Sequence, residues 1–264
     1  MVKIVGILNI TPDSFFDGGK YFSKDLACKQ VAKLLQDGVD IIDIGAESTK
    51  PNATALTDQQ ELARLEILPQ IIAMVADFNK KTAKNIQTSI DSYHYQTIAK
   101  AIAYGIDIVN DVSGLVDRKI IDLIASQQVK VILMHNLAIH AKPDLIVNPN
   151  LNINNEIISW AKNKIDYLLG CGLKKEQLIF DPGIGFSKNA LQSIRILKNI
   201  NEYRILNVPI LVGHSNKSFL DSIDSKYSDR HNKTLEISRF LINNKVDYLR
   251  VHDVSAHSKI INAA

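Results

Sequence analysis

The chain alternates between short apolar runs rich in β-branched residues and longer segments in which apolar residues recur with a helical period. Each short run is followed by a loop with Gly, Asp or Asn, an order that predicts parallel strands joined by crossover helices. Most runs are apolar throughout, as expected for strands covered on both faces. The predicted strands are Ile4–Leu8, Asp40–Ile44, Ile86–Ile90, Ile106–Asn110, Val129–Met134, Gln177–Phe180, Val208–Val212 and Asp247–Val251.

Helices are predicted between these strands, and several have recognisable ends. Ser23 can cap the first helix, whose apolar stripe stops before Gly38. Thr57 and Gln60 form a capping box for the second, which is expected to continue to about Phe78. The later predicted helices are Tyr93–Tyr104, Arg118–Ser126, Asn154–Leu169, Asn189–Asn199, Lys217–Ile223 and Lys233–Asn243, with a short last one after His252.

The number of strand-helix units decides the predicted fold class. Eight units in a chain of 264 residues predict one α/β domain, residues 1–264, folded as a (β/α)8 TIM barrel, an architecture of about 250 residues. A doubly wound open sheet is the alternative, but no Gly-rich dinucleotide fingerprint follows the first predicted strand. The longest stretch without a predicted element is Asn136–Asn150.

Composition and charge exclude several classes of protein. The net charge is +3 and is spread along the chain, so the basic stripe of a nucleic-acid-binding protein is not expected. No apolar run is long enough for a membrane span and no secretory pattern opens the chain, which favours a cytoplasmic protein without a membrane partner. Cys28 and Cys171 lie in helical patterns and are predicted to be packing residues.

Polar residues gather where the predicted strands end. In a TIM barrel the carboxyl ends of the strands meet at one mouth, which carries the active site. A single Asp or Asn there is explained as well by a helix cap or a turn, but polar residues follow all eight predicted strands. These residues are Asn9 to Gly19, Glu47 to Pro51, Asp91, Asn110 with Asp111, His135, Asp181 to Gly185, Gly213 to Ser218, and Arg250 to Asp253.

These residues divide into two chemical groups. The first combines carboxylates, an amide and an ammonium, which match the N–H, amino and carbonyl groups of a flat heterocycle such as a 2-amino-4-oxopterin. The second offers oxygen ligands and cationic donors, as a diphosphate with Mg²⁺ requires. The first group is Asp91, Asn110, Asp181 and Lys217, and the second is Asn9, Thr49, Lys50, Arg250 and His252. The predicted helix that opens at Asn216 could in addition hold a carboxylate on its exposed N–H groups.

Seven motifs, spread from Ile4 to about Ser258, resemble those of the dihydropteroate synthase family in order and spacing. The motifs are Gly6 to Phe15 with Asp17 to Gly19, Asp43 to Pro51, Ser89 to Asp91, Asn110 to Gly114, Asp181 to Phe186, Ser215 to Ser218, and Arg250 to Asp253. The resemblance implies an enzyme, a transferase that joins 6-hydroxymethyl-7,8-dihydropterin diphosphate to 4-aminobenzoate in folate biosynthesis. It also implies a sulfonamide target, a homodimer and, as one possibility, fusion to the pyrophosphokinase of the same pathway.

The same resemblance implies a role for each matching residue. Asn9 would ligate Mg²⁺, and with Thr49, Arg250 and His252 it would surround the diphosphate. The pterin would be held by Asp91, Asn110, Asp181, Lys217 and Arg250, while Phe15, Pro51, Lys217 and Ser218 would frame the aminobenzoate. Asp91, Asp181, Lys217 and Arg250 would be the catalytic residues.

Two departures from the family pattern leave other functions open. Lys50 and Asn216 stand where the family usually has arginine, and neither keeps the bidentate geometry of a guanidinium. One alternative is a pterin-binding methyltransferase that uses methyltetrahydrofolate, against which the complete diphosphate motifs argue. The other is a pterin-binding paralogue without catalytic activity, for which these two replacements would be the first sign.

Overall fold

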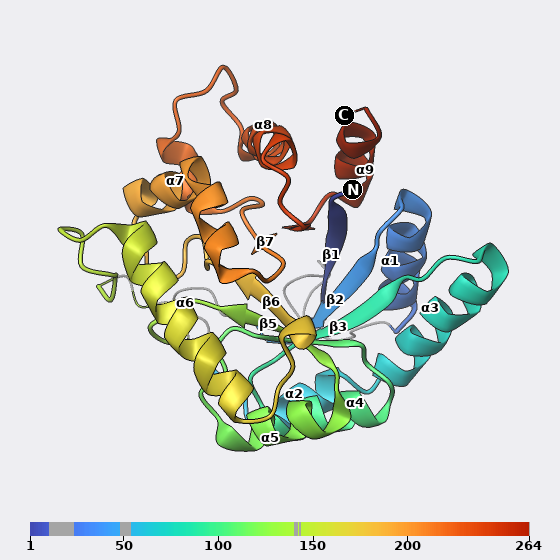
Figure 1. The fold of residues 1–264 in the computed structure, drawn as a ribbon. Coiled ribbons are helices and arrows are strands. Elements are labelled where there is room, and N and C mark those ends of the chain that lie inside the picture. Colours follow the sequence, from blue (N-terminus) through green and yellow to red (C-terminus); the bar gives the residue numbers. More distant parts are fainter. Residues whose placement is uncertain (11–23, 48–53, 140–141, 143, 264) are drawn as a thin grey trace.

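Eight parallel strands form a nearly closed barrel in the computed structural model, which describes residues 1–10, 24–47, 54–139, 142 and 144–263 (Figure 1). The sheet order is β6-β5-β4-β3-β2-β1-β8-β7. A single bridge from Phe180 to Ile210 joins β6 to β7 and brings the sheet back on itself. The strands are β1 Lys3–Asn9, β2 Ile41–Gly45, β3 Gln87–Asp91, β4 Ile108–Asp111, β5 Lys130–Met134, β6 Leu178–Asp181, β7 Leu211–Val212 and β8 Tyr248–Val251. The TIM-barrel prediction is confirmed.

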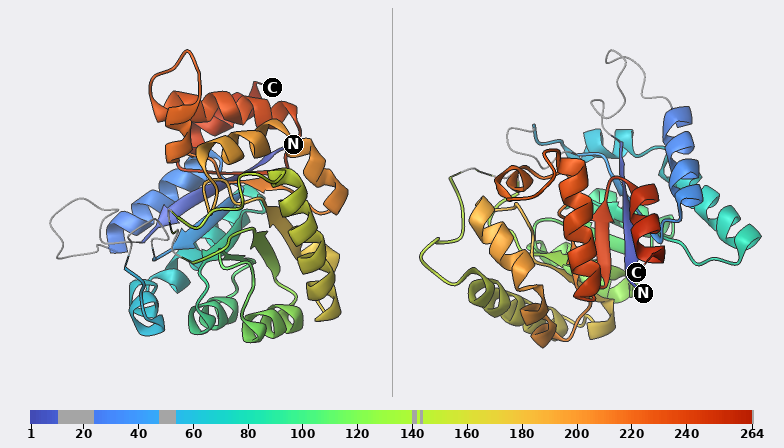
Figure 2. Two further views of the ribbon diagram at one scale, coloured as in Figure 1. Left: turned by 90° about the vertical axis from the view of Figure 1, so that its left-hand side faces the viewer. Right: turned by 90° about the horizontal axis from the view of Figure 1, so that it is seen from above.

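Helices surround the strands, as Figures 1 and 2 show from three directions. The α-helices are α1 Lys24–Asp37, α2 Asp58–Arg64, α3 Leu68–Thr82, α4 Tyr95–Ala103, α5 Arg118–Gln127, α6 Ile153–Gly170, α7 Ala190–Lys198, α8 Arg230–Asn243 and α9 Val254–Asn262. The 3-10 helices in the described ranges are η2 Lys175–Gln177, η3 Ile200–Leu206 and η4 Ser218–Ser222. The capping box of Thr57 and Gln60 is present, whereas Ser23 lies outside the described residues. Cys28 and Cys171 are free thiols packed against the core, as predicted.

The single helix predicted from Thr57 to about Phe78 is wrong, because two helices occupy this stretch. The first, α2, is capped by Leu65, and α3 begins at Leu68 with Pro69 in its first turn. Proline lacks the N–H that a continuous helix needs, and its ring collides with the carbonyl four residues earlier. That carbonyl belongs to Leu65 and instead accepts from the Leu68 N–H at 2.9 Å.

Two predicted elements near the end of the barrel are shorter than expected. The strand predicted as Val208–Val212 is reduced to Leu211–Val212, since Pro209 cannot donate to a ladder and the N–H of Ile210 donates to the Asp247 carboxylate at 2.8 Å. The helix predicted as Lys217–Ile223 is the five-residue 3-10 helix η4. The predicted helix type is therefore wrong, whereas the carboxylate site on its first N–H groups stays a prediction.

The barrel interior contains a small apolar layer that is separate from the larger core between strands and helices. Its members are buried and come from seven of the eight strands: Val5, Ile41, Ile108, Ile132, Ile179, Leu211 and Tyr248. Side chains along a strand alternate between its two faces. Residues two or four positions further on, toward the carboxyl ends, therefore point to the same inner side.

A buried chain of hydrogen bonds joins the end of β7 to α8 and α9. The Ser238 hydroxyl lies 2.9 Å from Nε2 of both His214 and His257, and His257 Nδ1 faces the carbonyl of Asp253. A carbonyl only accepts, so His257 carries its proton on Nδ1, while His214 donates from Nε2, which also lies 3.2 Å from the Thr234 carbonyl. The Ser238 hydroxyl donates its single hydrogen to the same Thr234 carbonyl at 2.9 Å. Burial lowers the pKa of His214 to about 3 and also lowers the pKa of His257.

These histidines should make the fold sensitive to acid. Their folded-state pKa values lie below the ordinary value of about 6.5, so the unfolded chain takes up protons that the native state refuses as the pH falls below that value. At pH 4.5, His214 alone should cost about 2–3 kcal/mol of the stability present at neutral pH. Urea unfolding at pH 7.5 and 4.5 checks this, because His214→Gln should show a smaller loss between the two pH values than the parent. Equal losses in both proteins would contradict the assignment.

Candidate active site

Polar side chains replace the apolar layer on the inner side of the barrel as the strands approach their carboxyl ends. Asp43 follows Ile41 by two positions, Asn110 follows Ile108, and Asp181 follows Ile179. Arg250 follows Tyr248 in the same way. Because side chains alternate along a strand, these four residues are expected on the inner face of the barrel. They stand near the carboxyl ends of their strands, which meet at one shared mouth.

Arg250 lies at the centre of an ion-pair cluster at this mouth. Its Nε donates to Asp43 Oδ2 at 2.6 Å, and its Nη2 donates to Asp91 Oδ2 at 2.5 Å. Asn110 donates to the same Asp43 oxygen at 3.0 Å. The predicted residues Asp91, Asn110 and Arg250 are thus brought together by Asp43, a fully buried residue to which the sequence analysis gave no role. Its sequence signals are a charge within an otherwise apolar strand and its place at the start of the second motif.

The charges of this cluster depend on one another. Burial raises the pKa of Asp91, and the guanidinium of Arg250 opposes that rise. Burial by itself would lower the pKa of Arg250, but the carboxylates of Asp43 and Asp91 raise it. Arg250 is therefore a permanent cation that holds two carboxylates in place. The second oxygen of Asp43 is buried and has no hydrogen-bond partner among the described residues.

Asp181 and Lys217 form a second charged group, also from the predicted set. Asp181 Oδ1 accepts from the N–H of Gly183 at 2.7 Å, and burial raises the pKa of its carboxyl against the opposing charge of Lys217. Lys217 donates to the carbonyl of Ile184 at 2.5 Å and lies 4.5 Å from the ring centre of Phe186. Burial lowers the pKa of Lys217 to about 8, although Asp181 favours the ammonium.

A buried lysine that the sequence analysis missed supports the loop after β6. Lys188 Nζ lies 2.9 Å from His135 Nδ1 and donates to the carbonyls of His135 and Phe186 at 3.1 and 2.8 Å. His135 in turn packs edge-on against Trp160. Lys188 thus connects the end of β5 to the loop on which Lys217 rests. Its sequence context gave no sign of this, since a lysine before a helix is usually solvated.

The other predicted residues divide between described and undescribed parts of the chain. Asn9 is exposed at the end of β1, and Ser218 is exposed at the start of η4. His252 is exposed just after β8, where its Nδ1 lies 3.0 Å from the Ser215 hydroxyl. Thr49 and Lys50 of the diphosphate set, and Phe15 and Pro51 of the aminobenzoate set, lie outside the described residues. Asn216 has a left-handed backbone with φ of 57°, a conformation that asparagine tolerates better than arginine does.

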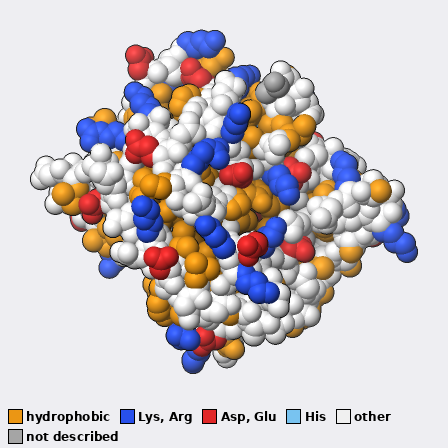
Figure 3. Space-filling view, in the orientation of Figure 1, with side chains coloured by type: hydrophobic (Ala, Val, Ile, Leu, Met, Phe, Trp, Pro, Cys, Tyr) orange, Lys and Arg blue, Asp and Glu red, His pale blue; other side chains and the backbone are white. Residues whose placement is uncertain are grey.

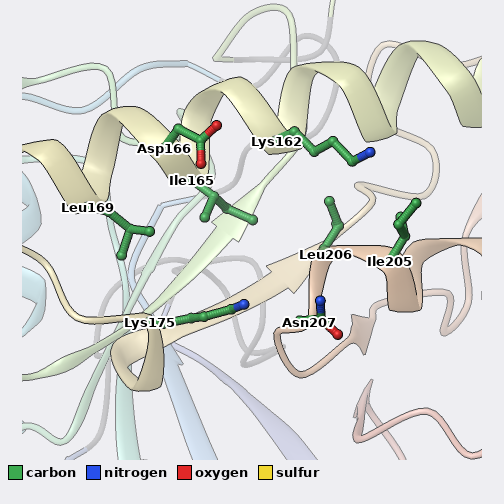
Figure 4. Close-up of a pocket in the computed structure, with 8 residues that line it drawn as sticks. All are labelled: Lys162, Ile165, Asp166, Leu169, Lys175, Ile205, Leu206 and Asn207. Atoms are coloured by element: carbon green, nitrogen blue, oxygen red, sulfur yellow. The ribbon is translucent and has the colours of Figure 1, made fainter.

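Two further surfaces lie apart from this mouth. A pocket of about 280 Å³ opens on the outside of the barrel between α6, η2 and η3 (Figure 4). Its lining residues are Lys162, Ile165, Asp166, Leu169, Lys175, Ile205, Leu206 and Asn207. Lys175 and Asn207 precede β6 and β7, so this pocket is nearer the opposite end of the barrel. On the face drawn in Figure 3 acidic and basic side chains are interspersed.

Comparisons with known proteins identify the family of the chain. A family model described as pterin binding enzyme matches residues 5–252. The chain belongs to this family, as a member of its dihydropteroate synthase branch. The dihydropteroate synthase of Haemophilus influenzae is 33% identical over 98% of the chain and 91% of its own length. The predicted family and the class of enzyme, a transferase of folate biosynthesis, are confirmed.

Solved dihydropteroate synthases share the fold over nearly the whole length. The enzyme of Anaplasma phagocytophilum, solved with bound 6-hydroxymethylpterin-monophosphate, has a TM-score of 0.88 and 34% identity and covers 99% of this chain and 97% of its own. That of Xanthomonas albilineans, solved with 4-aminobenzoic acid, has a TM-score of 0.86 and 28% identity over 99% and 91%. Fusions exist among the relatives, since a folate synthesis bifunctional protein of Chlamydia caviae is 30% identical over 99% of this chain and 58% of its own. No helix in the described parts of the chain is long and apolar enough to cross a bilayer.

Proposed function

We propose that this dihydropteroate synthase condenses 6-hydroxymethyl-7,8-dihydropterin diphosphate with 4-aminobenzoate, giving 7,8-dihydropteroate and diphosphate. The observation that carries the proposal is the convergence of Asp91, Asn110, Asp181 and Lys217 on the barrel mouth. These groups come from separate strands and loops, and Arg250 holds part of the set together. Such a set presents hydrogen-bond acceptors and donors to one flat heterocycle.

The hydrogen bonds already present leave atoms available for the pterin. Asp181 uses Oδ1 for the Gly183 N–H, which leaves Oδ2 as an acceptor for ring N–H or amino groups. Asn110 uses its amide N–H group for Asp43, which leaves its carbonyl oxygen. Lys217 donates one N–H to Ile184 and retains two for a ring carbonyl or nitrogen. Each atom so assigned has the polarity that a 2-amino-4-oxopterin requires.

The residues suit a reaction in which the leaving group departs first. The bond between the pterin methylene carbon and the diphosphate oxygen breaks, and the electron pair leaves with the diphosphate. The carboxylates of Asp91 and Asp181 stabilise the positive charge that develops on the pterin. The amine nitrogen of 4-aminobenzoate then forms the new bond to the methylene carbon and loses its proton to water. Positioning of two bound reactants supplies much of the rate.

The diphosphate side of the mouth consists of Asn9, Thr49, Arg250 and His252 in this proposal. The exposed amide of Asn9 at the end of β1 offers an oxygen, the donor type that Mg²⁺ prefers, and Mg²⁺ is commonly bound through few protein ligands plus substrate phosphates. The donor set therefore fits Mg²⁺, which would supply charge neutralisation for the departing diphosphate. Arg250 keeps its Nη1 group for a ligand, since its hydrogen bonds to the described residues use Nε and Nη2.

Turnover should accordingly depend on Mg²⁺. Addition of EDTA is expected to abolish formation of dihydropteroate, because a hard cation on the leaving group contributes several kcal/mol of transition-state stabilisation, and excess Mg²⁺ should restore it. Asn9→Ala should raise the Mg²⁺ concentration needed for half-maximal rate, with Asn232→Ala on α8 as the control. Undiminished turnover in EDTA would refute the metal assignment.

The decisive test of the function is the reaction itself. The chain, the pterin diphosphate, 4-aminobenzoate and Mg²⁺ should give dihydropteroate, detected by chromatography and mass spectrometry. Binding of the pterin without any product would instead identify a paralogue that has lost catalysis. The homodimer, a fusion partner of this chain and its cytoplasmic location stay predictions.

A further inference from the structure

A second cluster of charged side chains lies beside the mouth, where β2 gives way to the segment before α2. Glu47 is almost buried and accepts from the Tyr93 hydroxyl at 2.7 Å and from the Leu56 N–H at 3.3 Å. Its second oxygen lies 2.9 Å from His94 Nε2, while His94 Nδ1 lies 2.8 Å from Asp58 Oδ1. His94 therefore stands between two carboxylates from different elements.

The geometry indicates that both ring nitrogens of His94 carry a proton. A neutral imidazole has one donor and one acceptor nitrogen, whereas an ionised carboxylate only accepts. Both nitrogens face carboxylate oxygens within 3 Å, so two favourable hydrogen bonds require both nitrogens to carry protons. Burial by itself would lower the pKa of His94, but the bond to Glu47 and the charges of Glu61, Glu47 and Asp58 together raise it.

Other groups around His94 agree with a cation at this position. Glu61 on α2 is fully buried and accepts from the Ser92 hydroxyl at 2.8 Å, and the same hydroxyl oxygen accepts from the N–H of His94 at 3.1 Å. The ring of Tyr93 packs beside the imidazole at 4.3 Å between centres. Arg64 is the nearby cation on α2, and it donates to the Ala46 carbonyl at 2.9 Å. The carboxylates of Glu47, Asp58 and Glu61 thus face one imidazolium.

We propose that His94, as an imidazolium, is a positioning residue that fixes both ends of the segment between Glu47 and Asp58. The chain leaves β2 at Glu47 and returns to α2 at Asp58, and His94 bonds to both of these residues. Thr49 and Pro51, assigned above to the diphosphate and the aminobenzoate, lie within this segment. One consequence is that deprotonation of His94 weakens binding of these substrates. Only this consequence rests on the proposed function.

The protonation state can be measured without any activity. Long-range ¹H–¹⁵N correlation spectra of the protein should show His94 with both ring nitrogens protonated at pH 7.0, above the ordinary pKa of about 6.5. The resonance is assigned by its loss in His94→Leu. The imidazolium state is complete at lower pH and is lost as the pH rises through the raised pKa. A neutral ring at pH 7.0 would overturn the proposal, whether or not the chain makes dihydropteroate.

Kinetics then separate positioning from mere structural support. His94→Leu should raise the KM for 4-aminobenzoate about tenfold at pH 7.0, as expected for the loss of a charge-assisted hydrogen bond, with a smaller change in kcat. His94→Arg keeps N–H donors and a charge at every pH, so it should restore the KM and flatten its rise in alkaline solution. His231→Leu is the matched control, because His231 is half exposed and lies 3.9 Å from one carboxylate.

Each outcome bears on a different statement. A tenfold higher KM in His94→Leu with the parental value in His231→Leu supports the positioning role. A lower melting temperature for His94→Leu with parental KM values and an unchanged pH profile would show that His94 only stabilises the fold, and the proposal would fail. Absence of dihydropteroate from the parent protein would refute the proposed function, while the spectra would still decide the state of His94.

Discussion

Replacement of Arg250 by Met should lower the free energy of unfolding by about 3–5 kcal/mol, the usual cost of removing one partner of a buried ion pair. The reason is Asp43, which is fully buried, has one oxygen without a partner and relies on Arg250 for its counter-charge. Urea unfolding at pH 7.5 measures the loss. The same variant should release no measurable product, since Asp91 would also lose its partner.

A double substitution and a surface control make this result specific. Adding Asp43→Asn to Arg250→Met should recover part of the lost stability, because the fully buried carboxylate of Asp43 is then no longer left without its counter-charge. Arg118 pairs with Asp122 in the exposed first turns of α5, so Arg118→Met should leave the unfolding transition almost unchanged. Similar losses for Arg250→Met and Arg118→Met would mean that the buried cluster does not stabilise the barrel.

Asp181→Asn should weaken pterin binding by roughly 10- to 150-fold, the equivalent of about 1.5–3 kcal/mol. The amide oxygen can still accept from Gly183, so the loop is retained, but an N–H₂ group replaces the oxygen proposed to accept from the pterin. The loss should be equal for hydroxymethyl-dihydropterin and its diphosphate. Isothermal titration of both ligands provides the measurement.

His252→Ala is the matched comparison for Asp181→Asn. His252 is assigned to the phosphate side and lies exposed after β8, so its removal should weaken the diphosphate ligand and leave the plain pterin unaffected. If both ligands lose affinity equally in His252→Ala, the division of the mouth into a pterin side and a phosphate side is wrong at this residue.

The sequence predicted the strands better than it predicted the helices and loops around them. Strand positions follow from continuous apolar runs with two covered faces, and each of the eight was located. The break between α2 and α3 depends on Pro69, whose effect on a strong apolar period was underestimated. The shortness of β7 depends on Pro209 together with the hydrogen bond that the Ile210 N–H donates to Asp247, a partner distant in sequence.

The candidate site was predicted as a set of residues but not as a network. Asp91, Asn110, Asp181, Lys217 and Arg250 stand at strand ends, where a barrel places its functional groups, so their position followed from the fold. The supporting residues could not be found in this way. Asp43, Lys188 and His94 act through partners on other strands or loops, such as His135 for Lys188, and no local pattern in the chain announces such pairs.

The layer of seven apolar side chains inside the barrel has a consequence for how the site can change. The interior of a TIM barrel is a packed core rather than a pore, so ligands are expected to enter at the end with the charged groups. Because the layer and the polar groups occupy the same face of β2, β4, β6 and β8 two positions apart, a one-residue insertion within one of these strands would exchange the two faces beyond that point. Single replacements that keep the spacing between the layer and the polar groups can alter ligand preference. An insertion that shifts this spacing would instead place charged side chains among the surrounding helices.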